Sequence, residues 1–242
     1  MNPDRVDKHT DRETLAAVHR RPGLDRYVRY LASIEALVAL GGDRLLHHVF
    51  DLALDEGIPL AAIHEVMLQA CVFCGFPRTI NGFLVLHRCL RERGGDPEAP
   101  PPGALLDLRA PEEMERMGQE LFRVIYRHNH AEVQRSLHLS HPELLRWVVE
   151  VVYGKVLSRP GLDPKTRELA AVAALTVLGV YPQLLSHIKG GLNLGAGKEE
   201  VEEVILQMEV YVPADKVERA LRILNLGTRV RDKAGTPHLG TG

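Results

Sequence analysis

Residues 65–69 read EVMLQ, and residues 203–207, 138 positions further along the chain, read EVILQ. The match extends well beyond this word. Without a gap, 14 of the 42 positions in 31–72 are identical to their counterparts in 169–210. Self-similarity at a fixed offset is the signature of an internal repeat. The sequence therefore predicts two copies of one structural unit in a single chain, with the second copy longer at its front.

The breaks between helix-sized segments are shared by the two copies, as glycines at equivalent positions. A cluster of proline and glycine at 94–103, GGDPEAPPPG, is typical of a linker. We therefore assign residues 1–98 to an N-terminal unit and residues 99–242 to a C-terminal unit, and we expect a polar, disordered tail from residue 227. The shared glycine pairs are Gly41 with Gly179 and Gly57 with Gly195.

The apolar residues recur at helical spacing along almost the whole chain, as at Leu145, Val148, Val149 and Val152. No segment shows the sustained period-two alternation of a strand bounded by hairpin turns. We therefore predict an all-α fold, a helical bundle built from two repeated units. The longest apolar run, 169–180, is shorter than the roughly 20 residues that span a bilayer, which indicates a buried core helix.

The composition is that of an ordinary globular protein, with 242 residues of which 45% are hydrophobic and 26% charged. The 30 basic and 32 acidic residues nearly cancel, so neither nucleic acid nor an acidic membrane surface is an expected partner. The polar start, MNPDRVDKHTDRE, lacks the apolar stretch of a signal peptide. We expect a cytoplasmic protein whose partners are a small-molecule substrate and copies of itself.

Two cysteines stand three apart in QACVFCGFP, the spacing of a dithiol redox pair. The helix that begins after Pro59 reaches Cys71 and Cys74 in its last turn, before Gly75 and Pro77 end it. The helix dipole there disfavours a thiolate. The equivalent positions in the second copy hold no cysteine, so the repeated unit does not require thiols. We interpret both cysteines as packed hydrophobic residues and keep a thiol redox pair as the alternative.

The second copy carries two recognisable stretches, RPGLDPKTRELAAVAALTVLG at 159–179 and PQLLSHIKGGLNLGAGKEEVEEVILQ at 182–207. They resemble the carboxymuconolactone decarboxylase and alkylhydroperoxidase D superfamily. The first copy is similar to the final segment of this pattern. The resemblance implies an all-helical fold around a helical hairpin, oligomers whose interfaces wall the active sites, and no cofactor.

The resemblance also implies a proton relay formed by Glu168 and His187, which lie 19 residues apart as the glutamate and histidine do in peroxidase-type members. Those members place reactive thiols seven and four residues before the histidine, where this chain has Val180 and Gln183. Typical decarboxylases have a serine where Glu168 stands. The chain therefore departs from both named activities. The alternative is structural: Glu168 pairs with Arg167 or a cap, and His187 is a packed core histidine.

The first copy lacks both relay residues, with Tyr30 in place of Glu168 and Val49 in place of His187. We therefore expect a degenerate N-terminal site and an N-terminal unit that replaces a second subunit. His130 and Tyr211 are tentative residues of the substrate pocket. The histidine cluster at 128–141 lacks the convergent ligands that zinc requires, so no metal is predicted.

Three functions remain open. The first is a lyase of the carboxymuconolactone decarboxylase type that uses the Glu168 and His187 relay on a carbonyl or lactone substrate. The second is a peroxiredoxin-like thiol antioxidant that uses Cys71 and Cys74, and the third is a non-catalytic oligomeric scaffold. Because single-unit members of the family form rings of six, the resemblance implies a homotrimer of this two-unit chain with one site per chain.

Overall fold

The protein is described by a computed structural model, which places residues 10–96, 107 and 109–234. Every regular element among these residues is helical and none is a strand, so the all-α prediction is confirmed. The N-terminal helices are α2 (Arg12–His19), α3 (Arg26–Leu40), α4 (Asp43–Asp55) and α5 (Leu60–Glu92). The following helices are α6 (Pro111–Tyr126), η1 (Arg127–Asn129), α7 (His130–Ser140), α8 (Pro142–Trp147) and η2 (Val148–Leu157). The remaining helices are α9 (Pro164–Leu178), α10 (Tyr181–Asn193), α11 (Lys198–Leu206), η3 (Gln207–Val210) and α12 (Ala214–Ala234).

The repeat reappears in the helix boundaries. The starts of α9, α10 and α11 lie 138 residues after the starts of α3, α4 and α5. Both central helices end at an equivalent glycine in the left-handed conformation, Gly41 at φ 72° and Gly179 at φ 73°, where a side chain would be strained. A cation from the following segment then binds a carbonyl in the last turn of each helix: Arg78 donates to Ala39 and Lys216 donates to Val177.

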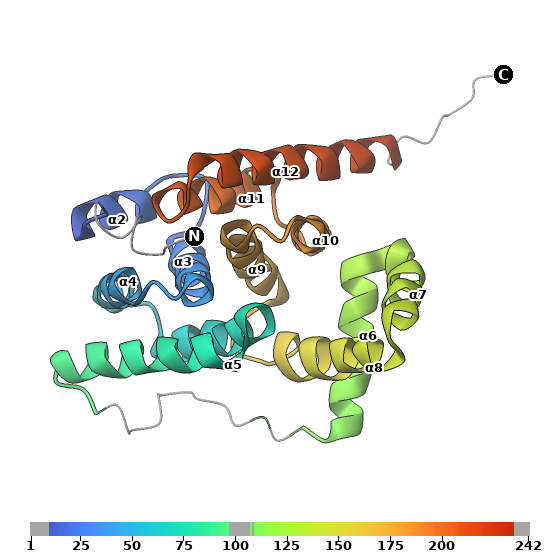
Figure 1. Ribbon diagram of the computed structural model, residues 1–242, viewed down its shortest axis with the longest axis horizontal. Helices are drawn as coiled ribbons and strands as arrows, with labels where there is room; N and C mark the ends of the chain where they lie inside the picture. Colours follow the sequence, from blue (N-terminus) through green and yellow to red (C-terminus); the bar gives the residue numbers. More distant parts are fainter. Residues whose placement is uncertain (1–9, 97–106, 108, 235–242) are drawn as a thin grey trace.

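The two copies pack through α3 and α9, which lie side by side at the centre of the molecule (Figure 1). α5 lies along one side of this pair, and α11 and α12 lie along the opposite side. α6, α7 and α8 stand at one end, where α6 packs against α10. A single large core of aliphatic side chains from both units fills the space around α3 and α9. The two units therefore share one core.

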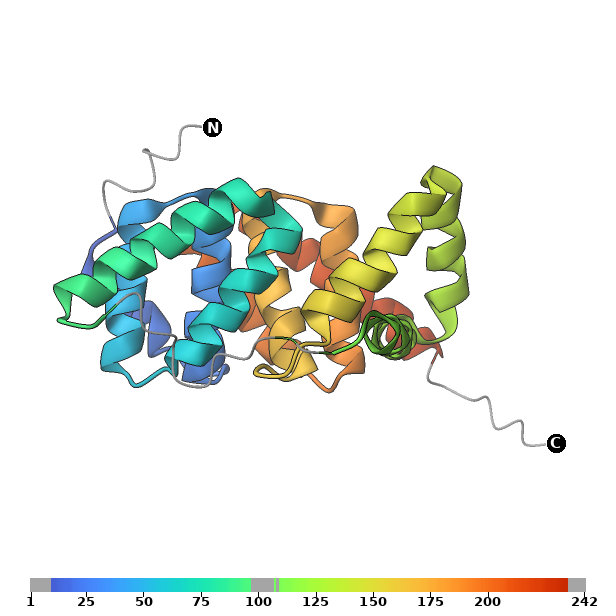
Figure 2. The same cartoon turned by 90° about the horizontal axis from the view of Figure 1, so that it is seen from below.

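Helix α5 is broken at Gly75, which has φ 77° and ψ 168°, so two helical segments meet there at an angle (Figure 2). The sequence predicted that the helix ends at Gly75 and Pro77. The first segment does end there, and a second segment starts beyond the break and runs to Glu92, because proline fits the first turn of a new helix. By length and apolar composition alone α5 could cross a membrane, but one such helix is weak evidence for a membrane span. Its first segment packs in the core.

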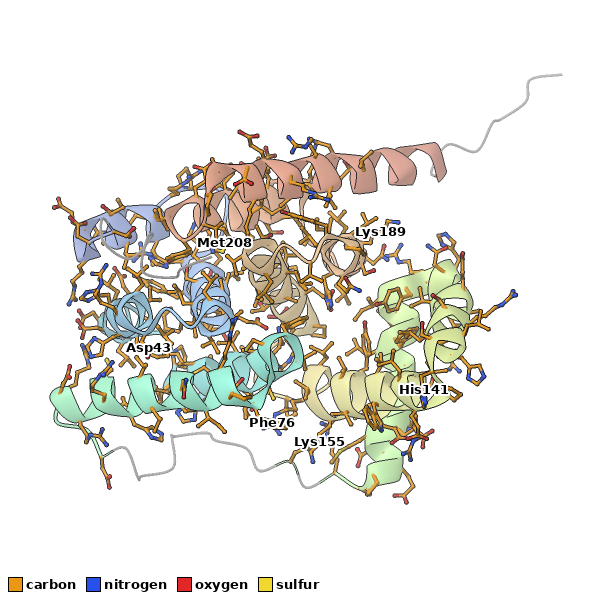
Figure 3. The ribbon with its side chains drawn as sticks, in the orientation of Figure 1. Asp43, Phe76, His141, Lys155, Lys189 and Met208 are labelled. Atoms are coloured by element: carbon orange, nitrogen blue, oxygen red, sulfur yellow. The ribbon has the colours of Figure 1, made fainter. Side chains whose placement is uncertain are left out.

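The second segment of α5 carries an exposed apolar stripe of residues four apart. Phe76 lies at the outer edge of the helix and is 73% exposed (Figure 3). Ile80 and Leu84 continue the stripe and are also exposed.

At the other end of the chain, α12 continues to Ala234. The disordered tail expected from residue 227 is therefore wrong for 227–234, and its remainder lies outside the described residues, as does most of the expected linker.

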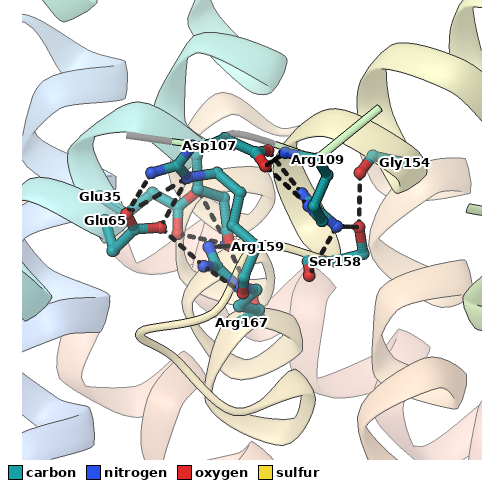
Figure 4. A network of polar contacts seen from close by, with 9 residues as sticks. Glu35, Glu65, Asp107, Arg109, Gly154, Ser158, Arg159 and Arg167 are labelled. Carbon is teal, nitrogen blue, oxygen red and sulfur yellow. Dashed lines mark hydrogen bonds and ion pairs between the residues drawn. The ribbon is translucent and has the colours of Figure 1, made fainter. Parts of the chain in front are cut away.

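A buried ion pair ties the C-terminal unit to the N-terminal unit (Figure 4). The Arg167 guanidinium donates to the Glu65 carboxylate at 2.9 Å and to the Gln69 side-chain oxygen at 3.2 Å. Arg159 binds the same carboxylate at 2.7 Å. Burial opposes ionisation of Glu65, but the hydrogen bonds from the two arginines outweigh it and lower the pKa of this carboxyl. The repeated motif EVMLQ therefore supplies Glu65 and Gln69, the partners of Arg167 in the other unit.

The same arrangement occurs in reverse on the opposite side. Arg29 donates to Glu203 at 2.8 Å and to Gln207 at 3.2 Å, and Arg21 binds the same carboxylate at 3.1 Å. Each of these residues is 138 positions from its counterpart in the first network. The two units are thus related as the subunits of an isologous dimer, in which each contact is made twice. The residues shared by the two copies therefore form the two equivalent ion-pair networks between the units.

Candidate active site

Helix α9 carries Glu168 one turn inside its start. The Asp163 carboxylate caps the helix by accepting from the Thr166 backbone N–H at 3.0 Å, and Pro164 occupies the first turn. Glu168 then points into the protein, with 1% of its surface exposed. The capped start therefore fixes the position of a buried carboxylate, as the sequence predicted for the helix start.

Helix α10 carries His187, which meets this carboxylate. The distance from His187 Nδ1 to Glu168 Oε2 is 3.0 Å, and His187 is 8% exposed. A carboxylate oxygen accepts, so Nδ1 holds the proton that it donates, and Nε2 is left for another partner. Val180 precedes this helix and Gln183 lies in its first turn, where the resemblance places peroxidase thiols. The spacing of 19 residues therefore does correspond to a direct contact.

Gly190 makes room for the carboxylate. A Cβ at this position would lie 2.3 Å from Glu168 Oε2 and 3.0 Å from Ile125 Cγ2, closer than carbon atoms approach. The equivalent residue in the first copy is Leu52, where the helix equivalent to α9 carries Tyr30. The glycine is therefore part of the site, because no other residue leaves space for Glu168 beside His187.

The N-terminal unit supplies one wall of this site. The Phe73 ring of α5 meets the His187 ring edge to face, with centroids 5.4 Å apart. Phe73 is the counterpart of Tyr211, which we expected in the pocket. The structure instead places Tyr211 in the other half, where its hydroxyl donates to Ser33 at 3.0 Å. Because the end of the first segment of α5 reaches the other unit, the aromatic residue beside His187 comes from the first copy.

The degenerate site of the first copy is filled. Ser33 accepts from Tyr211 and lies 3.0 Å from His19 Nε2, and His19 Nδ1 lies 2.7 Å from the Leu15 carbonyl. Tyr30, in place of the glutamate, stacks on the His19 ring at 4.1 Å. Burial lowers the pKa of His19 to about 4, so this imidazole is neutral at pH 7. Hydrogen bonds therefore link Tyr211, Ser33 and His19 in a line that ends at the Leu15 carbonyl inside the core.

A pair of tyrosines from the front of the second unit stands beside Glu168. Tyr153 on η2 donates to the Tyr126 hydroxyl at 2.9 Å. Burial raises the pKa of both hydroxyls, and the negative charge of Glu168 raises each of them further. The Ser186 hydroxyl acts in the opposite direction and lowers the pKa of Tyr126. Glu168 therefore bonds to the His187 imidazole and acts electrostatically on two tyrosine hydroxyls.

A second buried carboxyl lies close by, on α3. Glu35 accepts from Gln69 Nε2 at 3.0 Å, and the same nitrogen donates to the Arg167 carbonyl at 2.8 Å. Burial holds the pKa of Glu35 well above its usual range, against the attraction of Arg167 and the Gln69 hydrogen bond. The charge of Glu168 adds to this effect. The second copy has Ala173 at this position, so this carboxyl breaks the symmetry of the two units.

The cysteines lie at the end of the first segment of α5. Burial raises the pKa of Cys71 and Cys74, and Thr79 opposes this with a hydrogen bond. Cys74 Sγ lies 3.1 Å from the Ala70 carbonyl, the contact of a thiol that acts as a donor. This is an environment of protonated thiols, as the helix position predicts.

His130 lies at the start of α7, where its Nδ1 is 2.8 Å from the Arg127 carbonyl. Nothing in the described residues brings it to the relay, and its role in a pocket stays a prediction. No three His, Cys, Asp or Glu side chains among the described residues are arranged to hold a metal ion.

Sequence reasoning missed Phe73, Tyr126, Tyr153 and Gly190 as parts of the site. The sequence did contain a signal for Phe73. Glu65 and Gln69 precede it at four-residue spacing on the same helix, and both are polar residues inside an apolar helix that recur in both copies. Such residues need a buried partner, which here lies in the opposite unit. The tyrosines come from the front segment that the first copy lacks, so the repeat gives no indication of their place.

The sequence pattern of the carboxymuconolactone decarboxylase family matches residues 8–88 and 142–226, one region in each unit. The chain belongs to this family. It is 33% identical over 76 residues to 4-carboxymuconolactone decarboxylase of Acinetobacter baylyi, an alignment that covers 31% of this chain and 57% of that protein. The family match in two regions agrees with the tandem duplication.

Two other relatives have names that state no reaction. The chain is 34% identical over 143 residues to peroxisomal protein 2 of Schizosaccharomyces pombe, covering 57% of this chain and 63% of that protein's length. It is 32% identical over 114 residues to an uncharacterized 15.0 kDa protein of Paracoccus denitrificans, covering 46% of this chain and 85% of that protein.

Proposed function

We propose that the chain is a small-molecule enzyme of the decarboxylase type, in which Glu168 and His187 move a proton on a carbonyl or lactone substrate. The 3.0 Å contact between His187 Nδ1 and the buried Glu168 carboxylate carries this proposal. The carboxylate fixes the tautomer and orientation of the ring and stabilises the imidazolium when Nε2 takes a proton. Membership of the family and the decarboxylase named among the relatives support the reaction class.

The proton balance assigns a task to each residue. When a carboxylate leaves as carbon dioxide, the electron pair of the broken carbon–carbon bond passes into a conjugated carbonyl and forms an enolate. The carbon that lost the carboxylate must then gain one proton. The His187 imidazolium gives this proton from Nε2 and regains it from solvent, while Glu168 keeps the ring in place. Nothing in this step requires a thiol.

The test is turnover of 4-carboxymuconolactone, measured as release of carbon dioxide. It compares the wild type with two single variants of the relay and with their double variant. Glu168→Gln and His187→Ala should each remove most of the activity, and the double variant should lose little more, because the two residues act as one unit. The matched control is the exposed pair of His47 and Glu92, whose contact is 2.8 Å. His47→Ala and Glu92→Gln should leave turnover unchanged. Additive losses at the relay would favour a purely structural pair.

The thiol and scaffold alternatives give different results in the same assay. A peroxide-dependent disulfide between Cys71 and Cys74 that turns over with a reductant would establish a thiol antioxidant. The raised pKa of both thiols opposes this function, because the thiolate is the nucleophile. A chain that is silent with lactone, keto acids and hydroperoxide would be the non-catalytic scaffold.

The cytoplasm is our proposed compartment, on the composition. Two relatives, from fission yeast and from Saccharomyces cerevisiae, are instead named peroxisomal. Imaging a fluorescently tagged chain beside a peroxisomal marker in fission yeast would distinguish the two compartments.

A further inference from the structure

The hydroxyls of Tyr126 and Tyr153 are held in a fixed direction. Tyr153 donates to the Tyr126 oxygen at 2.9 Å, and the Phe122 ring packs against both tyrosine rings, at 4.4 and 4.9 Å between centroids. Tyr153 lies in a ten-residue π-helix, a geometry that is rare and that occurs frequently at functional sites. Because Tyr153 uses its proton on Tyr126, the proton of Tyr126 itself remains available to a third group.

The residues on both sides of Tyr126 bond to the helix that carries the relay histidine, Ile125 through its backbone carbonyl and Arg127 through its guanidinium group. Asn193, at the end of α10, donates to the Ile125 carbonyl at 2.7 Å and accepts from Arg127 at 2.8 Å. Arg127 has φ 47°, a positive value that no other non-glycine residue in the described part of the chain adopts. Strain of this kind persists where the surrounding structure imposes it, and it concentrates at functional sites.

The residue before this tyrosine lies close to the relay carboxylate. Ile125 Cγ2 and Glu168 Oε2 approach the same point above Gly190, so the end of α6 lies against Glu168. The groups that act on the Tyr126 hydroxyl are Tyr153 from η2, Glu168 from α9 and the uncharged Ser186 from α10. Tyr126 is half-buried, whereas Tyr153 is buried behind it. Tyr126 is therefore the more exposed of the two tyrosines.

We propose that Tyr126 is the hydrogen-bond donor for the substrate carbonyl oxygen and that Tyr153 is its positioning residue. This inference rests on the proposed function and deepens it. When the bond to the leaving carboxylate breaks, its electron pair makes the carbonyl oxygen an enolate, and the Tyr126 O–H stabilises that charge. Tyr153 strengthens the donor by donating to its oxygen. The substrate class is a carboxylate whose breaking bond is conjugated, directly or through a double bond, with a ketone or lactone carbonyl.

The kinetic test uses 4-carboxymuconolactone with Tyr126→Phe and Tyr153→Phe, which keep both rings. Loss of one oxyanion donor costs about 100-fold or more in kcat, so Tyr126→Phe should lower kcat by about this factor with little change in KM. Tyr153→Phe should give a smaller loss, in kcat again. The matched control is Tyr181→Phe on α10, whose ring faces Arg219 at 4.1 Å and keeps that contact without its hydroxyl. Its kcat should be unchanged.

A second measurement does not depend on turnover. The tyrosinate absorbance of Tyr126 is obtained by subtracting the titration of Tyr126→Phe from that of the wild type. Glu168→Gln removes a negative charge and should lower the pKa of Tyr126, whereas Tyr153→Phe removes a donated hydrogen bond and should raise it. Shifts of opposite sign are not produced by a general loosening of the fold.

The outcomes separate the two proposals. A wild type that does not decarboxylate the lactone, with both titration shifts present, would overturn the proposed function and leave the coupled donor in place. Unchanged kcat in Tyr126→Phe, in an active enzyme, would overturn the donor role alone. A Tyr126 that titrates without responding to Glu168→Gln would overturn the coupling, whatever the activity.

Discussion

Replacing Gly190 with alanine should disable the relay and leave the fold standing. The new Cβ would lie 2.3 Å from Glu168 Oε2 and 3.0 Å from Glu168 Cδ, so the carboxylate must move away from His187. Overpacking of this size costs about 1–3 kcal/mol. Against this, replacing glycine by alanine inside a helix contributes about 1 kcal/mol to stability. The free energy of unfolding should therefore fall by roughly 2 kcal/mol at most.

The neighbouring glycine provides the matched control. A Cβ at Gly191 would lie 3.7 Å from Glu168 Cβ and 3.8 Å from Ala196 Cβ, which are ordinary contacts. Gly191→Ala should therefore raise the free energy of unfolding by about 0.5–1 kcal/mol and keep full activity. Gly190→Ala should lose activity about as severely as His187→Ala. Urea unfolding measures the first quantity, and turnover of 4-carboxymuconolactone measures the second.

The signal of the His187 Nδ1 proton in an NMR spectrum reports directly on the bond to Glu168. It should shift or vanish in Gly190→Ala and persist in Gly191→Ala. If Gly190→Ala keeps both this signal and the activity, the carboxylate does not need the space that the glycine provides, and the reasoning from close contact is wrong.

Three further predictions follow from other parts of the molecule. The pKa of His19 is lowered to about 4, so the unfolded chain binds a proton there first, and stability is complete above pH 6.5 and lost as the pH falls towards 4. This amounts to about 3 kcal/mol of unfolding free energy, and His19→Gln should flatten that acid limb in urea titrations. Replacing Cys71 and Cys74 together with alanine should leave turnover intact and lower the melting temperature slightly, and loss of turnover would contradict the packed-residue interpretation. We also propose a homotrimer with one ligand bound per chain, and light scattering coupled to size exclusion should give the mass of three chains, whereas a stable single-chain mass would exclude it.

The sequence was sufficient for the helices and for the repeat because both depend on local signals. Helix α9 begins where a capping aspartate and a proline predict it, and both central helices stop at glycines. The contact between Glu168 and His187 follows from a hairpin of two consecutive helices, so 19 residues of separation were enough to predict it.

The remaining features depend on how the units meet, which no periodic pattern reports. Phe73 and its counterpart Tyr211 each contact the opposite unit, and the prediction for Tyr211 took no account of this. The break at Gly75 was expected from the sequence, and the helical segment beyond it agrees with the helical spacing of the apolar residues. The end of α12 was misjudged because a polar sequence can still continue a helix that is anchored at its start.

The packed first-copy site has an evolutionary consequence: a Glu and His pair is difficult to restore there by single substitutions. Restoring Tyr30→Glu alone would remove the stacking on His19 and bury a carboxylate, while Val49 offers no imidazole and Leu52 occupies the space that Gly190 leaves open in the other half. Val49→His alone would gain nothing. A lineage that carries this arrangement would need at least three coordinated changes to recover a second centre, and each intermediate is less stable than its parent. The duplication thus leaves one half with the Glu168 and His187 contact and one half without it.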